Sequence, residues 1–359
     1  MGLPEYSGGP FFLTYFKEIS VMAFLSQNAF FTALRMLGLA SALLALVFVI
    51  NNFLIFGIDA PGVINTLRLG DIFGVDRPKQ GYNISQVLLG IAQTGVVGLV
   101  IAYTTWRGLK PNNLRIDANW MDDMSAYIVR LAFWGVLLVG IADAVLSFLR
   151  VEGFHTVLFG QAGGAAIALP SERGLFVHIP LIVLSGIIAL REKSVSLVWL
   201  TLLVVVAEFL IVVARFIYGY EQTFMGDLVR FWYAALFLFA SAYTLKEDAH
   251  VRVDVFYASL KRRTRSILNV VGTVFFGIPL CWLILMRGLW GKSSLINSPM
   301  MNFETSMSGF GMYVKYLMAA FLIVFALSML FQFTAYLFSS LADIEENVVD
   351  EGAAEGVVS

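Results

Sequence analysis

Residues 195–218, VSLVWLTLLVVVAEFLIVVARFIY, decide the fold class, because they have the length and the composition of a membrane-spanning helix. A helix needs about 20 mostly apolar residues to cross the hydrocarbon core of a bilayer. Within this stretch only Glu208 and Arg215 are charged. Similar stretches recur along the chain. We predict about eight transmembrane helices, at 33–57, 84–106, 127–149, 174–190, 195–218, 228–245, 267–290 and 311–338.

The composition of the whole chain agrees with an all-α integral membrane protein. Of its 359 residues, 59% are hydrophobic and 14% are charged, whereas soluble domains have about 45–50% apolar and about 25% charged residues. The net charge of −1 gives no basic surface that would favour nucleic acid. The loops are too short for a soluble catalytic domain, and the sequence motifs of zinc proteases, serine hydrolases and ATP-binding proteins are missing. We therefore expect no enzyme activity, no metal and no cofactor.

The two ends of the chain differ from the spans. Residues 1–31 mix aromatic side chains with charged ones, and we predict an amphipathic helix in the membrane interface. The C-terminal residues are rich in Asp and Glu and are predicted to be disordered. A polar turn at 191–194 separates the two sets of four spans. The expected regions are the interfacial segment 1–31, a four-helix region at 32–192, a second at 193–342 and the acidic tail 343–359.

Basic residues predict the orientation of the helices. Short loops with an excess of Lys and Arg face the cytoplasm. The loop after the sixth span is the most basic, and its alternating polar and apolar residues suit a segment on the cytoplasmic membrane surface. With eight spans, both termini are then cytoplasmic. The basic residues of this loop are Lys246, Arg252, Lys261, Arg262, Arg263 and Arg265.

Ionisable residues within the spans are candidate functional groups, because a charge at the centre of a membrane helix costs about 2.5–3.5 kcal/mol on insertion scales. Glu208 lies near the middle of the fifth span, and Arg215 follows two turns later on the same helix face. Asp143 and Arg150 repeat this spacing in the third span. Each acid either binds a proton or an ion, or is satisfied by a neighbouring helix or subunit.

The stretch around the sixth span carries the most specific pattern. Asp227 and Arg230 stand at its entry, and the span ends in a basic residue followed by Ala-His-Val-Arg-Val-Asp at 249–254 and a Lys/Arg cluster. A polar turn at 304–309 precedes the last span. Over about residues 195–340, this pattern resembles the small membrane subunit (DctQ type) of tripartite ATP-independent periplasmic (TRAP) transporters.

The resemblance implies a scaffold in a bacterial inner membrane. Such subunits bind no substrate. They pair with a large membrane subunit (DctM-like) that moves solutes, usually carboxylates and with sodium, after a periplasmic binding protein delivers them. The first 190 residues lie outside the resemblance, which implies an enlarged variant. The residues expected to have structural or interface roles, including contacts with lipid and docking of the binding protein, are Glu208, Arg215, Asp227, Arg230, His250, Arg252, Asp254, Arg287, Glu304 and Lys315.

Two other functions stay open. The chain could be a self-contained proton-coupled carrier or channel that uses Glu208 and Asp143, although the sequence has no inverted repeat of the kind that carriers often show. It could also be the membrane anchor subunit of a redox complex. A haem held by two imidazoles would need paired histidines on facing helices, and the three histidines of the chain lack that spacing.

Overall fold

The computed structural model describes residues 10–73, 81–110, 114–193, 198–217, 219–220, 222–246, 257, 260–306 and 310–356, with side chains described between 29 and 346. Over these ranges the protein is all-α, and eight helices are long and apolar enough to cross a membrane. The predicted fold class and the predicted number of spans are therefore confirmed.

The spans are formed by long helices, and shorter helices connect them. The first three lie in α1 (Pro10–Ile58), α4 (Ile84–Leu109) and α5 (Leu114–Val151). The fourth combines α7 (Pro170–Arg173), η1 (Gly174–His178) and α8 (Ile179–Arg191). The others are α9 (Val198–Ile217), α10 (Thr223–Lys246), the unit of α12 (Arg262–Gly272), η2 (Thr273–Gly277) and α13 (Ile278–Leu289), and α15 (Lys315–Gly356). The connecting helices are α2 (Gly62–Thr66), α3 (Gly70–Phe73), α6 (Phe154–Ile167) and α14 (Asn297–Met301).

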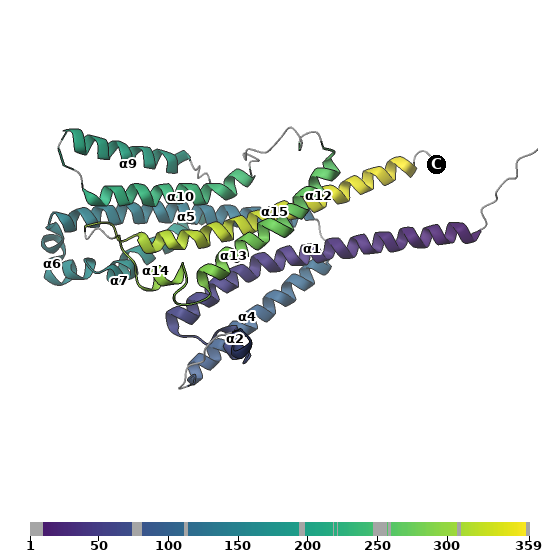
Figure 1. Ribbon diagram of the computed structural model, residues 1–359, viewed down its shortest axis with the longest axis horizontal. Helices are drawn as coiled ribbons and strands as arrows, with labels where there is room; N and C mark the ends of the chain where they lie inside the picture. The colour runs from purple at the N-terminus through teal and green to yellow at the C-terminus, as the bar shows by residue number, and fades with distance from the viewer. Residues whose placement is uncertain are drawn as a thin grey trace, which may run out of the picture.

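Helices α5 and α15 form the centre of the bundle (Figure 1). They pack against each other, and α10 contacts both of them. Helices α1, α12 and α13 cover α15, whereas α8 covers α5. The outermost helices are α4, which packs on α1, and α9, which packs on α10. Half of the most apolar window of α5 and of α15 is buried inside the chain, compared with 11% for α4 and α9, so most of the α4 and α9 surface is left for lipid or a partner.

Polar contacts define two ends of this bundle. At one end Asp117, near the start of α5, pairs with Arg35 of α1 and Arg107 at the end of α4. At the other end Asp143, two turns before the end of α5, pairs with Arg173 of α7. We call them the Asp117 end and the Asp143 end. Asp117 near the start of α5 pairs with Arg107 at the end of α4, and Asp143 near the end of α5 pairs with Arg173 at the start of the fourth span. These consecutive spans therefore run in alternating directions.

Two spans contain a proline, and both widen into a π-helix just before it. The sequences Phe-x-x-Ile-Pro-Leu at 176–181 and 275–280 place Pro180 in α8 and Pro279 in α13. Proline has no N–H and collides with the carbonyl four residues earlier in a regular helix. The chain accommodates this with five-residue turns, in which Ile179 N–H donates to the Gly174 carbonyl and Ile278 N–H to the Thr273 carbonyl.

The two ends of the chain were expected to be an interfacial helix and a disordered acidic tail. Residues 10–28 belong to the same helix as the first span, and their place in the membrane interface stays a prediction. At the acidic end α15 is a helix as far as Gly356, and Arg115 and Arg262 both pair with Asp343 and Glu346 near the start of the acidic segment. The disorder expected of residues 343–359 stays a prediction.

The contact between α1 and α15 depends on Gly38, and it yields a test of the packing. A Cβ atom at Gly38 would lie 2.8 Å from a ring carbon of Phe338, which is fully buried. We expect Gly38→Ala to lower the free energy of unfolding in detergent by about 1–3 kcal/mol, as overpacked cores do.

The matched control is Gly95→Ala in α4, where nothing lies within 4 Å of the added Cβ atom. Alanine favours a helix over glycine by up to about 1 kcal/mol, so this variant should be as stable as the wild type or more stable. Equal stability of the two variants would contradict the close approach at Gly38.

Candidate functional site

Asp143 is the centre of a buried polar cluster at the Asp143 end of the bundle. Its side chain is fully inaccessible. The Oδ1 atom accepts a hydrogen bond from Arg173 Nη1 at 2.9 Å and lies 3.1 Å from His178 Nε2. The Oδ2 atom accepts from the backbone N–H of Tyr313 at 2.8 Å. Because an ionised carboxylate can only accept, the contact with His178 places a proton on Nε2.

The cluster joins three parts of the chain. His178, in η1, lies with Nδ1 2.7 Å from the hydroxyl of Tyr316 in the first turn of α15. Arg173 also donates to Ser147 of α5 at 3.2 Å and to the Ile167 carbonyl at 3.0 Å. The N-terminal spans are thus bonded directly to the last span. Removing Asp143 would leave the Arg173 guanidinium buried without its counter-charge.

Tyr313 closes this cluster from the side of the loop before α15. Two guanidinium groups lie over its ring, with the Cζ atoms of Arg150 and Arg173 at 4.4 Å and 4.3 Å from the ring centroid. Arg150 donates to the Gly311 carbonyl at 2.8 Å, and the Tyr313 hydroxyl donates to the Ala168 carbonyl at 2.9 Å. The partner of Asp143 is therefore Arg173, whereas Arg150, which shares its helix, positions the loop.

A second cluster lies at the Asp117 end. Asp117 is almost completely buried and accepts hydrogen bonds from Arg35 Nε at 2.7 Å and from Arg107 Nη2 at 2.8 Å. Arg35 also donates to the Lys110 carbonyl at 2.8 Å. This arrangement holds α1, α4 and α5 together. Closer to the surface, Lys246 of α10 pairs with Asp122 of α5 at 2.7 Å.

The entry of the sixth span organises the loop that precedes α15. Asp227 accepts from the Met312 backbone N–H at 3.1 Å and from the Ser306 hydroxyl at 3.3 Å, and Arg230 lies 3.4 Å from the same carboxylate. In this loop Glu304 forms an exposed ion pair with Lys315 at 2.5 Å. Four of the residues singled out from the sequence thus lie around one loop.

Arg287 is placed differently. It lies exposed in the last turn of α13 and forms no hydrogen bond or ion pair with the residues that the structure describes. His250, Arg252 and Asp254 fall at 247–256, outside the described residues, so their role at the membrane surface stays a prediction.

Glu208 lies in the middle of α9, ten residues from Val198 and nine from Ile217. The sequence offered a buried carboxylate, held by a neighbouring helix, as one possibility. In the structure the residue is exposed on the outside of the chain and has no hydrogen-bond or ion-pair partner among the described residues. Arg215, two turns later, is exposed as well. At this depth an unpaired charge costs about 2.5–3.5 kcal/mol.

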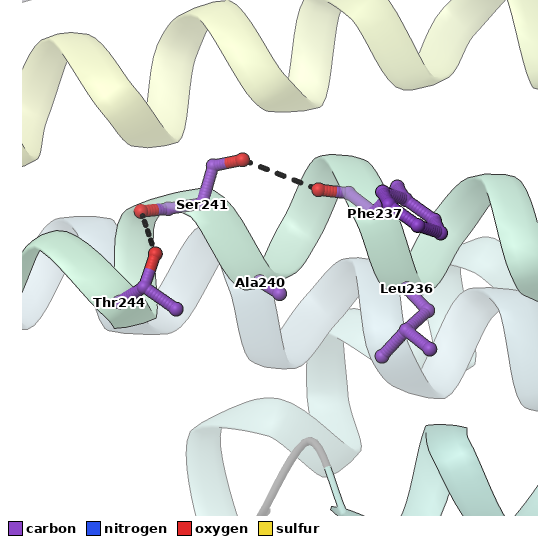
Figure 2. Close-up of a pocket in the computed structure, with 5 residues that line it drawn as sticks. All are labelled: Leu236, Phe237, Ala240, Ser241 and Thr244. Atoms are coloured by element: carbon purple, nitrogen blue, oxygen red, sulfur yellow. Dashed lines mark hydrogen bonds between the residues drawn. The ribbon is translucent and has the colours of Figure 1, made fainter. Parts of the chain in front are cut away.

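Helix α10 has a shallow, open hollow on its surface, lined by Leu236, Phe237, Ala240, Ser241 and Thr244 (Figure 2). Its two hydroxyl groups are already used, because Ser241 donates to the Phe237 carbonyl at 3.2 Å and Thr244 to the Ser241 carbonyl at 3.0 Å. Its lining has no cationic side chain. The hollow therefore does not have the chemistry of a site for a carboxylate solute.

The sequence did not single out Arg173, Arg35 and Asp117, which the structure places in the two buried clusters. A signal was present, because each is a charge close to the end of an apolar stretch. Their partners lie 30 residues away for Arg173 and 82 residues away for Arg35, and spacing along the sequence does not reveal such pairs.

The buried pair of Asp143 and Arg173 gives a quantitative test. Asp143→Leu leaves the Arg173 charge buried without its partner, and we expect the free energy of unfolding to fall by about 3–5 kcal/mol. The double variant Asp143→Leu/Arg173→Met removes both charges and should regain a large part of this loss. Unfolding in detergent, followed for all three variants, measures the coupling between the two side chains.

A pair at the surface serves as the control. Asp122→Asn weakens the contact with Lys246, whose side chain is 42% exposed, and should cost only about 0–1 kcal/mol. If Asp143→Leu and Asp122→Asn lowered the free energy of unfolding equally, the buried Asp143 cluster would stabilise the chain no more than an exposed ion pair does.

The comparisons with known proteins identify the C-terminal part of the chain. Residues 201–342 match the family model described as "Tripartite ATP-independent periplasmic transporters, DctQ component". No curated protein and no solved structure matches the chain. The matched range begins in α9 and ends in α15, so it contains the last four spans. The resemblance inferred from the sequence is confirmed: residues 201–342 are a DctQ domain, the small membrane component of a TRAP transporter, and four further spans precede this domain in the multi-pass membrane protein.

Proposed function

We propose that the protein is the stationary frame of a TRAP transporter that takes up carboxylate solutes with sodium. In this role the chain braces the large membrane subunit and helps to dock the periplasmic binding protein. The observation that carries the proposal is the Asp143 cluster, which fixes the third and fourth spans to the DctQ domain through buried, charged hydrogen bonds. A frame must not deform while its partner moves, and such contacts resist deformation.

The distribution of charge supports an orientation for this frame. The Asp117 end holds Arg107, Arg115, Lys246 and Arg262, and the loop that follows α10 is rich in further basic residues. By the positive-inside rule this end and both termini face the cytoplasm. The Asp143 end then faces the periplasm, where the binding protein approaches.

Charged groups around the loop before α15 are the proposed docking surface for the binding protein. Arg287 and Lys292 are exposed near the end of α13, and the exposed Glu304–Lys315 pair lies in the loop that Asp227 holds in place. Charges at the rim of an interface steer the encounter of two proteins and fix their register. Asp227 would act through the loop as a positioning residue.

The geometry does not favour the two alternative functions. A carrier that used Glu208 and Asp143 would need both on one path, but Asp143 is sealed within the bundle and Glu208 lies on the outer surface of α9. For a haem, His178 would have to offer a ring nitrogen, and both nitrogens contact protein groups, Asp143 and Tyr316.

Reconstitution tests the frame directly. We expect liposomes that contain this chain alone to take up no solute. Liposomes with the chain, the large membrane subunit and the binding protein should show uptake driven by a sodium gradient, and omission of this chain should abolish that uptake. Sodium-dependent uptake by the chain alone would contradict the proposed role.

The docking surface is tested by a charge reversal. Arg287→Glu should raise, several-fold, the concentration of binding protein that gives half-maximal uptake, and this effect should shrink at high salt because exposed charges are screened. The amount of large subunit that co-purifies should stay unchanged. The control is Lys261→Glu, an exposed residue at the start of α12 near the opposite end. The docking proposal would be abandoned if both variants behaved alike.

A further inference from the structure

The surface of α9 around Glu208 presents a charge where the surroundings of a lone membrane protein are apolar. Val205 and Val212 lie three residues before and four after Glu208, which places them on the same face of the helix. They are 58% and 49% exposed, and the neighbouring Phe209 is 63% exposed. The face is therefore an apolar stripe with one carboxylate at its middle and Arg215 two turns further along. We call it the Glu208 face.

The chain itself satisfies buried charges elsewhere in the bundle. Asp143 has Arg173 and His178 as partners, and Asp117 has two arginines. Glu208 differs from both, because none of the described helices supplies a cation or a donor to it. Helix α9 also packs chiefly on α10, through Leu200 and Ala207, so its outer side is not covered by the rest of the bundle.

We propose that the Glu208 face is where this chain binds the large membrane subunit, and that the partner places a basic side chain, Lys or Arg, opposite Glu208 at the middle of the membrane. This inference rests on the proposed function, since the large subunit is the partner that the DctQ family implies. The apolar residues of the face supply packing area, and the carboxylate selects one register of the partner helix.

A second copy of this chain fits the face less well. In a symmetric dimer the same patch is used on both subunits, so two Glu208 carboxylates would approach each other in a low-dielectric setting. Lipid alone fits no better, because acyl chains cannot offer a counter-charge. A basic residue from a different chain satisfies Glu208 in the way that Arg173 satisfies Asp143.

The experiment uses the full chain with an affinity tag, co-expressed with the large membrane subunit of its transporter. We expect Glu208→Leu to reduce the amount of large subunit that co-purifies by about tenfold, the change that corresponds to about 1.4 kcal/mol. Glu208→Lys, which reverses the charge, should remove it further. The control Leu210→Gln adds a polar group at a similar depth but about 200° around the helix, and it should leave the recovery unchanged.

Stability of the chain expressed alone separates docking from folding. Glu208→Leu removes an unpaired charge from an apolar surface, so the isolated variant should unfold at the wild-type temperature or above it. A lower unfolding temperature would show that Glu208 supports the fold of this chain, and the docking proposal would then be lost.

Photo-crosslinking identifies the occupant of the face. A benzophenone amino acid at Val212 should crosslink to the large subunit, whereas the same probe at Leu210, on the other side of α9, should not. A crosslink to a second copy of this chain, or none from Val212, overturns the proposal.

The co-purification experiment distinguishes a failure of the proposed function from a failure of the Glu208 face as the binding site. If the wild-type chain retains no large subunit, the proposed function itself fails. If both the wild type and Glu208→Leu retain it equally, only the assignment of the Glu208 face fails.

Discussion

A charge buried among membrane helices needs a counter-charge or several hydrogen bonds, because no water is available to solvate it. This constraint fixes the architecture around Asp143. Its carboxylate is satisfied only when the fourth span supplies Arg173 and His178 and the loop before α15 supplies the Tyr313 backbone N–H. The π-helical turn before Pro180 contains His178, so the local distortion of that helix is part of how the imidazole reaches its place. Once these groups meet, α5, the fourth span and α15 are held in one register.

The second cluster complements the first from the opposite end of α5. Asp117 binds Arg35 and Arg107, which attaches α1 and α4. Between the two clusters, α5 and α15 form the most extensive helix–helix contact in the described part of the bundle. A long helix that is fixed at both ends can neither slide nor change its tilt without breaking buried charged hydrogen bonds. The N-terminal spans and the DctQ domain therefore form one body, and the extra helices widen it within the membrane.

The parts of this picture that the sequence could predict are those governed by local chemistry. Stretches of about 20 apolar residues read directly as spans, and a pattern around Asp227 and Arg230 led to the family. Two features depended on contacts between distant segments and were not readable. Which cation pairs with Asp143 is decided by packing, since Arg150 is nearer in sequence and Arg173 is nearer in space. The cations that pair with Asp343 are likewise Arg115 and Arg262, which come from other spans.

The same need for a counter-charge within the membrane applies to Glu208. Where the described part of this chain buries an acid, it also provides the base: other helices supply it to Asp143 and Asp117, and Arg230 of the same helix supplies it to Asp227. Glu208 lies near the middle of its span without one, on one of the two spans that are least buried within the described bundle. Within the DctQ domain α9 is therefore an edge, and an edge with an uncompensated charge is incomplete by itself. The proposed role as a frame needs such a surface, because Glu208 gains a counter-charge only when the partner is bound. Exposed apolar residues alone would be as stable against lipid as against a partner helix, whereas the carboxylate is satisfied only by a specific neighbour.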